Sequence, residues 1–204
     1  RRIMEITAIE PRRKRLSQLY LDGEAAVKVD TETLLKAGWK PGMEISDEDL
    51  HQLLQESEAR RAKEKALYLL EYRSHSKKEL ADKISRTTSR EAAEAAVDKM
   101  EELGLVNDED YGRQMAEYLL QKKGYGLRRA RQELLQKGID RELIEELLEE
   151  LAPDPEEKLR EIVERKYQNQ LDDEKGYRRT VAALQRLGYG WEDIKTVLAE
   201  FRGE

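Results

Sequence analysis

The chain has 204 residues, of which 40% are charged and only 6% aromatic, and its formal net charge is −6. This composition suits helices far better than sheets. The net charge argues against a dedicated nucleic-acid binder, although a local basic segment can still bind phosphate. There is no cysteine, which excludes disulfides, thiol nucleophiles and cysteine-based zinc sites.

No apolar run approaches the roughly 20 residues that span a bilayer, and the first residues lack the apolar core of a signal peptide. The absence of cysteine is compatible with a reducing compartment. We therefore expect a cytoplasmic protein that has no contact with membranes.

The first 45 residues differ from the rest because short runs rich in Ile, Leu, Tyr and Val occupy residues 3–9 and 16–29. The Asp22-Gly23 pair inside the second run is a strong signal for a tight hairpin. Residues 31–37 predict a short helix. The loop Arg12-Arg13-Lys14-Arg15 either contacts DNA or only aids solubility. We interpret residues 1–45 as a small appendage that contains a β-hairpin.

From residue 46 onward the signals are helical, and capping residues mark the helix starts. Apolar residues recur at spacings of three and four, which gives each helix one buried stripe. Capping boxes are predicted at Ser46 with Asp49, at Ser76 with Glu79 and at Thr88 with Glu91, and Asp154 before Pro155 predicts a further N-cap.

An internal repeat with a period of 50 residues organises this helical part. Arg128-Arg129 falls on Arg178-Arg179 and Gly126 falls on Gly176, while a more diverged copy places Leu80 opposite Leu134. Each copy predicts three helices. The predicted ranges are 62–73, 77–86 and 89–103, then 108–123, 127–137 and 140–151, then 154–170, 174–187 and 190–202.

These elements predict a mainly α fold, an elongated array of three tandem three-helix repeats that follows the β-hairpin appendage. Small repeats gain stability by stacking on their neighbours, and a monomer is expected. A three-helix unit with a short turn before its third helix also resembles a helix-turn-helix, which keeps DNA binding open as an alternative. The expected segments are 1–45, 46–106 (linker helix and repeat 1), 107–152 (repeat 2) and 153–204 (repeat 3).

Three stretches of the sequence resemble the RecX family, and the resemblance covers about residues 60–203. The third repeat departs most, because Lys175-Gly176-Tyr177 keeps only part of the glycine-aromatic-glycine pattern of the second. The stretches are Ala66-Leu67-Tyr68-Leu69-Leu70 with Arg73-Ser74-His75-Ser76 and Glu79-Leu80; Leu105-Val106-Asn107-Asp108-Glu109-Asp110-Tyr111; and Lys123-Gly124-Tyr125-Gly126 with Glu133-Leu134 and Lys137-Gly138-Ile139.

The resemblance implies a non-enzymatic regulator that binds filaments of the RecA recombinase on single-stranded DNA and mainly inhibits or disassembles them. RecA-dependent ATP hydrolysis and strand exchange would fall as a result, which places the protein in recombination, DNA repair and the SOS response. The RecA filament is the implied partner, with single-stranded DNA within or beside it as a further one.

A concentrated positive segment, residues 121–137, is followed by an acidic one, residues 139–161. A surface of both signs suits a partner that also carries both signs. A solvated helix face with weak internal pairs is the alternative for any single charge. The repeated arginine pairs are the first candidates for contact with carboxylates or phosphates. The candidate contact residues are Arg128, Arg129, Arg178, Arg179, Lys122, Lys123, Tyr125 and Arg131, with Lys77 and Lys78 as weaker counterparts.

No catalytic, metal or cofactor site is expected. Gly124 and Gly126 lack the Lys-Ser/Thr ending and the preceding strand of a phosphate-binding P-loop, so they predict a tight turn that presents Tyr125. His51 and His75 have no partners at ligand or proton-relay spacing. The alternative functions are a tandem helix-turn-helix-like DNA-binding module and an adaptor for some other partner.

Overall fold

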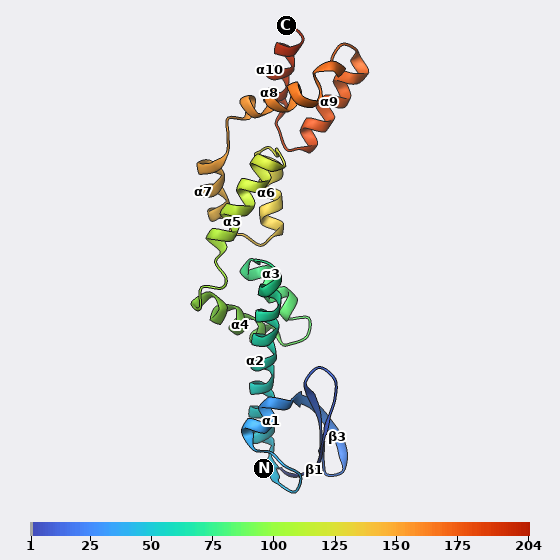
Figure 1. Cartoon of the computed structure of the whole chain (residues 1–204), viewed down its shortest axis with the longest axis vertical. Coiled ribbons are helices and arrows are strands. Elements are labelled where there is room, and N and C mark those ends of the chain that lie inside the picture. Colours follow the sequence, from blue (N-terminus) through green and yellow to red (C-terminus); the bar gives the residue numbers. More distant parts are fainter. Residues whose placement is uncertain (1) are drawn as a thin grey trace. The chain divides into compact units, whose positions relative to one another are not determined.

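The computed structural model describes residues 2–204, and it is mainly helical, as the composition predicted (Figure 1). These residues form ten α-helices and a four-stranded sheet. The chain divides into two compact units, one up to Val106 and the other from Asn107 to Glu204. Each unit has its own hydrophobic cores.

The first unit begins with an antiparallel sheet in the order β3-β2-β1-β4. The expected hairpin is confirmed: β2 and β3 pair around Asp22 and Gly23, whose φ angles of 52° and 85° are both left-handed. The fourth strand was not predicted. It pairs with β1, so the appendage is a four-stranded sheet and not a hairpin alone. The strands are β1 (Ile3–Pro11), β2 (Leu16–Leu21), β3 (Glu24–Asp30) and β4 (Glu44–Ser46).

Two helices follow the strands, α1 (Thr31–Ala37) and α2 (Asp47–Tyr72). The capping box at Ser46 is confirmed, since the Ser46 hydroxyl accepts from the Asp49 N–H at 3.1 Å. The helix α2 runs through 26 residues without a break. The predicted linker helix and the first helix of repeat 1 are therefore one element.

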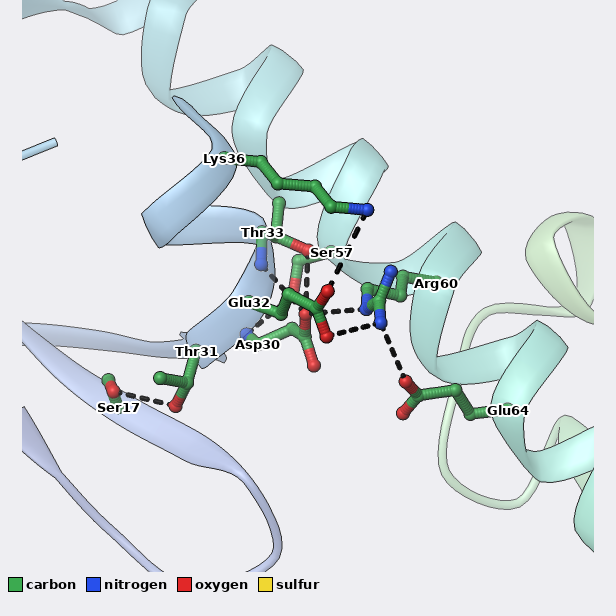
Figure 2. A network of polar contacts seen from close by, with 9 residues as sticks. All are labelled: Ser17, Asp30, Thr31, Glu32, Thr33, Lys36, Ser57, Arg60 and Glu64. Atoms are coloured by element: carbon green, nitrogen blue, oxygen red, sulfur yellow. Dashed lines mark hydrogen bonds and ion pairs between the residues drawn. The ribbon is translucent and has the colours of Figure 1, made fainter. Parts of the chain in front are cut away.

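A polar network fixes the end of β3 and the start of α1 to the middle of α2 (Figure 2). The buried Asp30 carboxylate caps α1 by accepting from the Thr33 N–H at 2.9 Å, and it lies 3.3 Å from Nε of Arg60. The Asp30 N–H donates to the Ser57 hydroxyl at 2.9 Å, and Arg60 also pairs with Glu32. Burying a carboxylate is costly unless hydrogen bonds and ion pairs replace the water that it loses. Asp30 thus joins the sheet to the helical part of its unit.

Repeat 1 combines the second half of α2 with α3 (Lys77–Ile84) and α4 (Arg90–Glu102), around a core that includes Ala66 and Leu80. The capping box at Ser76 is confirmed. The box predicted at Thr88 is wrong, because α4 is capped one residue later by Ser89, which accepts from the Ala92 N–H. The Thr88 hydroxyl instead donates to the Ile84 carbonyl at the end of α3.

The second unit holds two further three-helix groups. The N-cap predicted at Asp154 is confirmed, with Pro155 at the first helical position. Repeat 2 consists of α5 (Asp108–Glu117), the π-helical turn η1 (Tyr118–Lys122), α6 (Leu127–Gln136) and α7 (Arg141–Leu151). Repeat 3 consists of α8 (Pro155–Lys166), the 3-10 turn η2 (Gln168–Gln170), α9 (Glu174–Arg186) and α10 (Trp191–Phe201).

Burial sets the register of the three copies. The second helices bury equivalent pairs that are spaced by 50 residues, so Leu80 corresponds to Ala130 and not to Leu134 as the sequence comparison suggested. The correct counterparts are then Lys78, Arg128 and Arg178. The buried pairs are Leu80 and Ile84 in α3, Ala130 and Leu134 in α6, and Thr180 and Leu184 in α9.

Candidate partner-binding site

The basic segment of repeat 2 folds as a turn that is held against repeat 3. After η1, the chain reverses through Gly124, whose φ of 67° is left-handed, and α6 starts after Gly126. The Gly126 N–H donates to the Leu187 carbonyl at 2.8 Å, and the Tyr189 hydroxyl donates to the Gly124 carbonyl at 2.8 Å. The tight turn is as predicted, and its backbone is bound to the loop before α10.

Gly126 is required there by close approach. A Cβ at this position would lie 2.6 Å from the Gly188 carbonyl oxygen and 2.9 Å from the Tyr189 nitrogen. Its φ of −77° is open to any residue, so the constraint is the neighbouring backbone and not the dihedral angle. The glycine in the equivalent place of repeat 3, Gly176, faces the Gln170 carbonyl of its own repeat instead. Of these two equivalent glycines, Gly126 faces the next repeat and Gly176 does not.

Arg128 and Arg129 complete this junction by capping the C-terminal end of α9. Nη2 of Arg128 donates to the Gln185 carbonyl, and Nη1 of Arg129 donates to the Arg186 carbonyl at 2.9 Å. The last carbonyls of a helix lack partners within the helix and carry the negative end of its dipole, so guanidinium groups stabilise them. The pair therefore has a structural contact as well as exposed donors.

The Tyr125 ring orients the Arg129 side chain. The guanidinium lies 4.5 Å from the centre of the Tyr125 ring, its Nη2 donates to the phenol oxygen at 3.3 Å, and its Nε lies 3.1 Å from Glu133. Cation–π contact and a fixed fork leave little freedom to this side chain. Tyr125 is half-buried against the core of repeat 2, so its ring supports the arginine and is not freely presented as the sequence suggested.

An open cleft of about 410 Å³ lies at this junction. Three guanidinium groups and one carboxylate give it a net positive lining, and two amides add donors and acceptors. Such a surface fits a carboxylate or phosphate of a partner. Its lining residues are Arg128, Arg129, Gln132, Glu133, Gln136 and Arg186.

The remaining arginine candidates are placed differently. Arg131 points to α7, where its Nε and Nη2 hold both oxygens of Glu145, and this bidentate contact lowers the pKa of the Glu145 carboxyl. Arg178 is exposed, and its Nε lies 3.3 Å from the Glu174 carboxylate one helical turn earlier. Arg179 is also exposed. Arg178 and Arg179 thus project from repeat 3 without the capping task of their repeat 2 counterparts.

The lysine candidates are on the surface. Lys122 and Lys123 are exposed at the end of η1, and the Lys123 ammonium lies 5.8 Å from the centre of the Tyr118 ring. In the first unit, Lys77 lies 3.0 Å from Glu101 and Lys78 is exposed.

The sequence did not single out Arg186, Gln132 or Gln136 as part of the cleft. Arg186 stands 57 residues after Arg129 in the chain, and only the docking of α9 on the repeat 2 turn brings the two together. The 50-residue register does pair Arg186 with Gln136, so a signal existed, but it was not distinguishable from the charged surface of any other helix.

His75 is a buried polar group outside this cleft. Its Nδ1 lies 2.9 Å from the Arg73 carbonyl and its Nε2 lies 2.9 Å from the Lys83 ammonium. A carbonyl can only accept and an ammonium can only donate, so the neutral ring carries its proton on Nδ1. Burial lowers the pKa of His75 below its ordinary value. Within residues 2–204, no group of three or more His, Asp or Glu side chains is arranged to hold a metal ion.

Three-helix units with buried stripes in a common register define a tandem helical-repeat protein. Domain models of the RecX family match each unit: the first three-helix domain at residues 62–100, the second at 107–148 and the third at 154–198. The chain belongs to the RecX family. None of the helices in residues 2–204 has the length and apolar character needed to cross a membrane.

Relatives with the name regulatory protein RecX align over most of the chain. The protein of Caldanaerobacter subterraneus subsp. tengcongensis is 38% identical over 167 residues, covering 80% of this chain and 84% of the relative. The protein of Clostridium tetani is 30% identical over 205 residues, covering 97% of this chain and 94% of the relative. The family is therefore one of regulatory proteins.

Solved structures share the fold. A crystal structure of regulatory protein RecX is similar with a TM-score of 0.63 at 22% identity, and the match covers 95% of this chain and 98% of that one. The crystal structure of RecX from Lactobacillus salivarius gives a TM-score of 0.60 at 21% identity, covering 72% and 98% of the two chains.

Proposed function

We propose that this protein binds RecA filaments on single-stranded DNA and mainly inhibits or disassembles them, without catalysing a reaction itself. The observation that carries the proposal is membership of a family of regulatory proteins over all three repeats. The implied partner is RecA, as the sequence resemblance suggested. A protein that acts on RecA shares its compartment, so the cytoplasm follows from the proposed partner.

The surface charge supports a protein partner better than duplex DNA. In three-helix variants of the helix-turn-helix, such as the homeodomain, the third helix enters the major groove and must face a polyanion. Here the third helices are acidic: α4 carries five acids and two bases, α7 five acids and one base, and α10 three acids and one base. Tandem helix-turn-helix binding of duplex DNA is therefore the weaker alternative.

The candidate contacts are the cleft at the junction of repeats 2 and 3 and the exposed Arg178 and Arg179 of repeat 3. The cleft offers forked donors fixed by Tyr125 and by the end of α9, which suits a carboxylate on a RecA subunit. Arg178 and Arg179 offer the same chemistry from the exposed face of α9. The acidic third helices would face basic patches of the same partner.

The test is single-stranded-DNA-dependent ATP hydrolysis by RecA while this protein is titrated. Arg178→Ala with Arg179→Ala removes exposed charge and one surface helical pair, whereas Arg128→Ala with Arg129→Ala also removes the cap on α9. The proposed contacts are supported if the parent suppresses ATP hydrolysis and the repeat 3 variant needs at least a tenfold higher concentration for the same suppression. The free energy of unfolding of that variant should be unchanged. Full RecA activity at saturating parent protein contradicts the proposal.

Salt separates the proposal from the alternative. A bare-DNA binder that neutralises several phosphates loses affinity steeply with salt. If the parent binds duplex DNA as tightly as it binds RecA filaments at about 0.15 M salt, the helix-turn-helix alternative is favoured instead.

A further inference from the structure

Two exposed tyrosines occupy the same position in repeats 1 and 2. Tyr68 on α2 and Tyr118 on η1 are separated by 50 residues, and the residues around them are buried in the same register. The two residues are 52% and 47% exposed. The buried partners that fix this equivalence are Ala62 and Ala66 in α2, which correspond to Gly112 and Ala116 in α5. The two tyrosines therefore occupy equivalent positions in the structures of the two repeats.

Each ring carries a lysine. The Lys65 ammonium lies 5.4 Å from the centre of the Tyr68 ring, and the Lys123 ammonium lies 5.8 Å from the centre of the Tyr118 ring. The positions of the two lysines in the sequence differ: Lys65 precedes Tyr68 by three residues, whereas Lys123 follows Tyr118 by five. The same aromatic–cation pair has therefore been built twice with different residues.

The surrounding charge is positive in both places. Residues 61–73 carry four bases and two acids, and residues 111–123 carry three bases and one acid, in a chain whose net charge is −6. The corresponding stretch of repeat 3, residues 161–173, carries two bases and four acids, and Gln168 stands where the tyrosine would be. The ring, its lysine and the positive surroundings are present together in repeats 1 and 2 and missing together in repeat 3.

Repeat 1 adds a second ring. Tyr72 is 73% exposed, and its ring meets that of Tyr68 edge to face with centres 5.1 Å apart. The two hydroxyls are 3.3 Å apart, and this hydrogen bond raises the pKa of Tyr72. Exposed rings of this size are not stabilised by the core, so their apolar faces are available to a ligand.

The geometry points to a binding element for single-stranded DNA, in which Tyr68 and Tyr118 stack on bases and Lys65 and Lys123 contact the adjoining phosphates. Aromatic rings accept any unpaired base, and cations beside them follow the backbone. Paired bases are stacked within the duplex, so the element distinguishes single strands from duplex. This inference deepens the proposed function and rests on it, because the filament contains single-stranded DNA.

The test measures binding of the full chain to fluorescein-labelled oligothymidylate by anisotropy, in the absence of RecA and at about 50 mM salt. Tyr68→Ala and Tyr118→Ala are each expected to weaken binding about fivefold or more, and the double variant by the product of the two factors. Tyr68→Phe with Tyr118→Phe keeps the rings and should bind like the parent. Leu35→Ala removes an apolar side chain that is even more exposed, at 73%, and lies outside both repeats, so it is the control.

Several results would overturn the inference. These are a parent that does not bind oligothymidylate, a double alanine variant that binds like the parent, or phenylalanine variants that lose binding as well. A double alanine variant that binds the oligonucleotide normally but no longer suppresses RecA would show that the rings contact protein. The proposed function fails separately, if the parent binds the oligonucleotide but leaves RecA ATP hydrolysis unchanged.

Discussion

A methyl group added at Gly126 tests the junction between repeats 2 and 3 most directly. In Gly126→Ala, the new Cβ would lie 2.6 Å from the Gly188 carbonyl oxygen, so the turn must move away from the neighbouring backbone. Overpacking of this kind costs about 1–3 kcal/mol, and loss of the hydrogen bond to Leu187 adds about 1 kcal/mol. We expect the free energy of unfolding of the second unit to fall by about 2–4 kcal/mol.

Gly190→Ala is the matched control. Gly190 is also an N-cap glycine, with a φ of −80° against −77° for Gly126, but a Cβ there would meet nothing within 4 Å. Replacing an N-cap glycine by alanine weakens the cap, while the unfolded chain loses entropy, so the net change should stay within about 1 kcal/mol. The difference between the two variants isolates the close approach.

The two tryptophans make the measurement specific for one unit. Trp191 starts α10 in the second unit and Trp39 lies in the first, so urea unfolding of a Trp39→Phe protein reports the second unit through Trp191 fluorescence. A shift of about 2 kcal/mol corresponds to about 8 °C or more in Tm for a unit near 100 residues. Equal unfolding midpoints for Gly126→Ala and Gly190→Ala would refute the argument.

Three further changes test other parts of the structure. Asp30→Ala should destabilise the first unit by about 1–3 kcal/mol in urea unfolding followed at Trp39, because it removes the side-chain cap of α1 and one ion pair of Arg60, whose pairs with Glu32 and Glu64 remain; a change below about 0.5 kcal/mol would contradict the network. Tyr189→Phe should lower the stability of the second unit by about 1 kcal/mol through loss of the bond to Gly124, and an unchanged midpoint would mean that this bond is replaced by water. Because the pKa of His75 is lowered in the folded protein, the unfolded chain binds a proton first as the pH falls. The free energy of unfolding should therefore decrease below about pH 6.5, by at most about 1.4 kcal/mol per pH unit. His75→Gln should remove this part of the pH dependence, and parallel pH profiles of the variant and the parent would contradict the role of His75.

Local signals in the sequence were sufficient for most of the elements. The hairpin at Asp22-Gly23 and the caps at Ser46, Ser76 and Asp154 depend on residues within three positions of each other, so a pattern can reveal them. The wrong prediction at Thr88 also concerns neighbouring residues. Thr88 and Ser89 could both cap α4, and Ser89 does so because the Thr88 hydroxyl donates to the Ile84 carbonyl at the end of α3.

Longer-range features were not predictable in this way. The strand β4 depends on pairing with β1 some 40 residues earlier, and its three residues are too few to show a period. The arginine pair of repeat 2 was found because it recurs in repeat 3, yet its partners are backbone carbonyls 57 residues away. Carbonyls leave no trace in a sequence, so the capping task of these side chains could only be seen in the fold.

The contact of Gly126 with Gly188 has a consequence for how such a chain can evolve. Modules of an ideal repeat protein can be duplicated, deleted or exchanged, because each meets its neighbours through interchangeable surfaces. Here one repeat contributes a glycine and two arginines that fit only the particular loop of the next. We therefore expect that exchanging either of these repeats alone would disrupt the contacts between them, whereas the two could be transferred together.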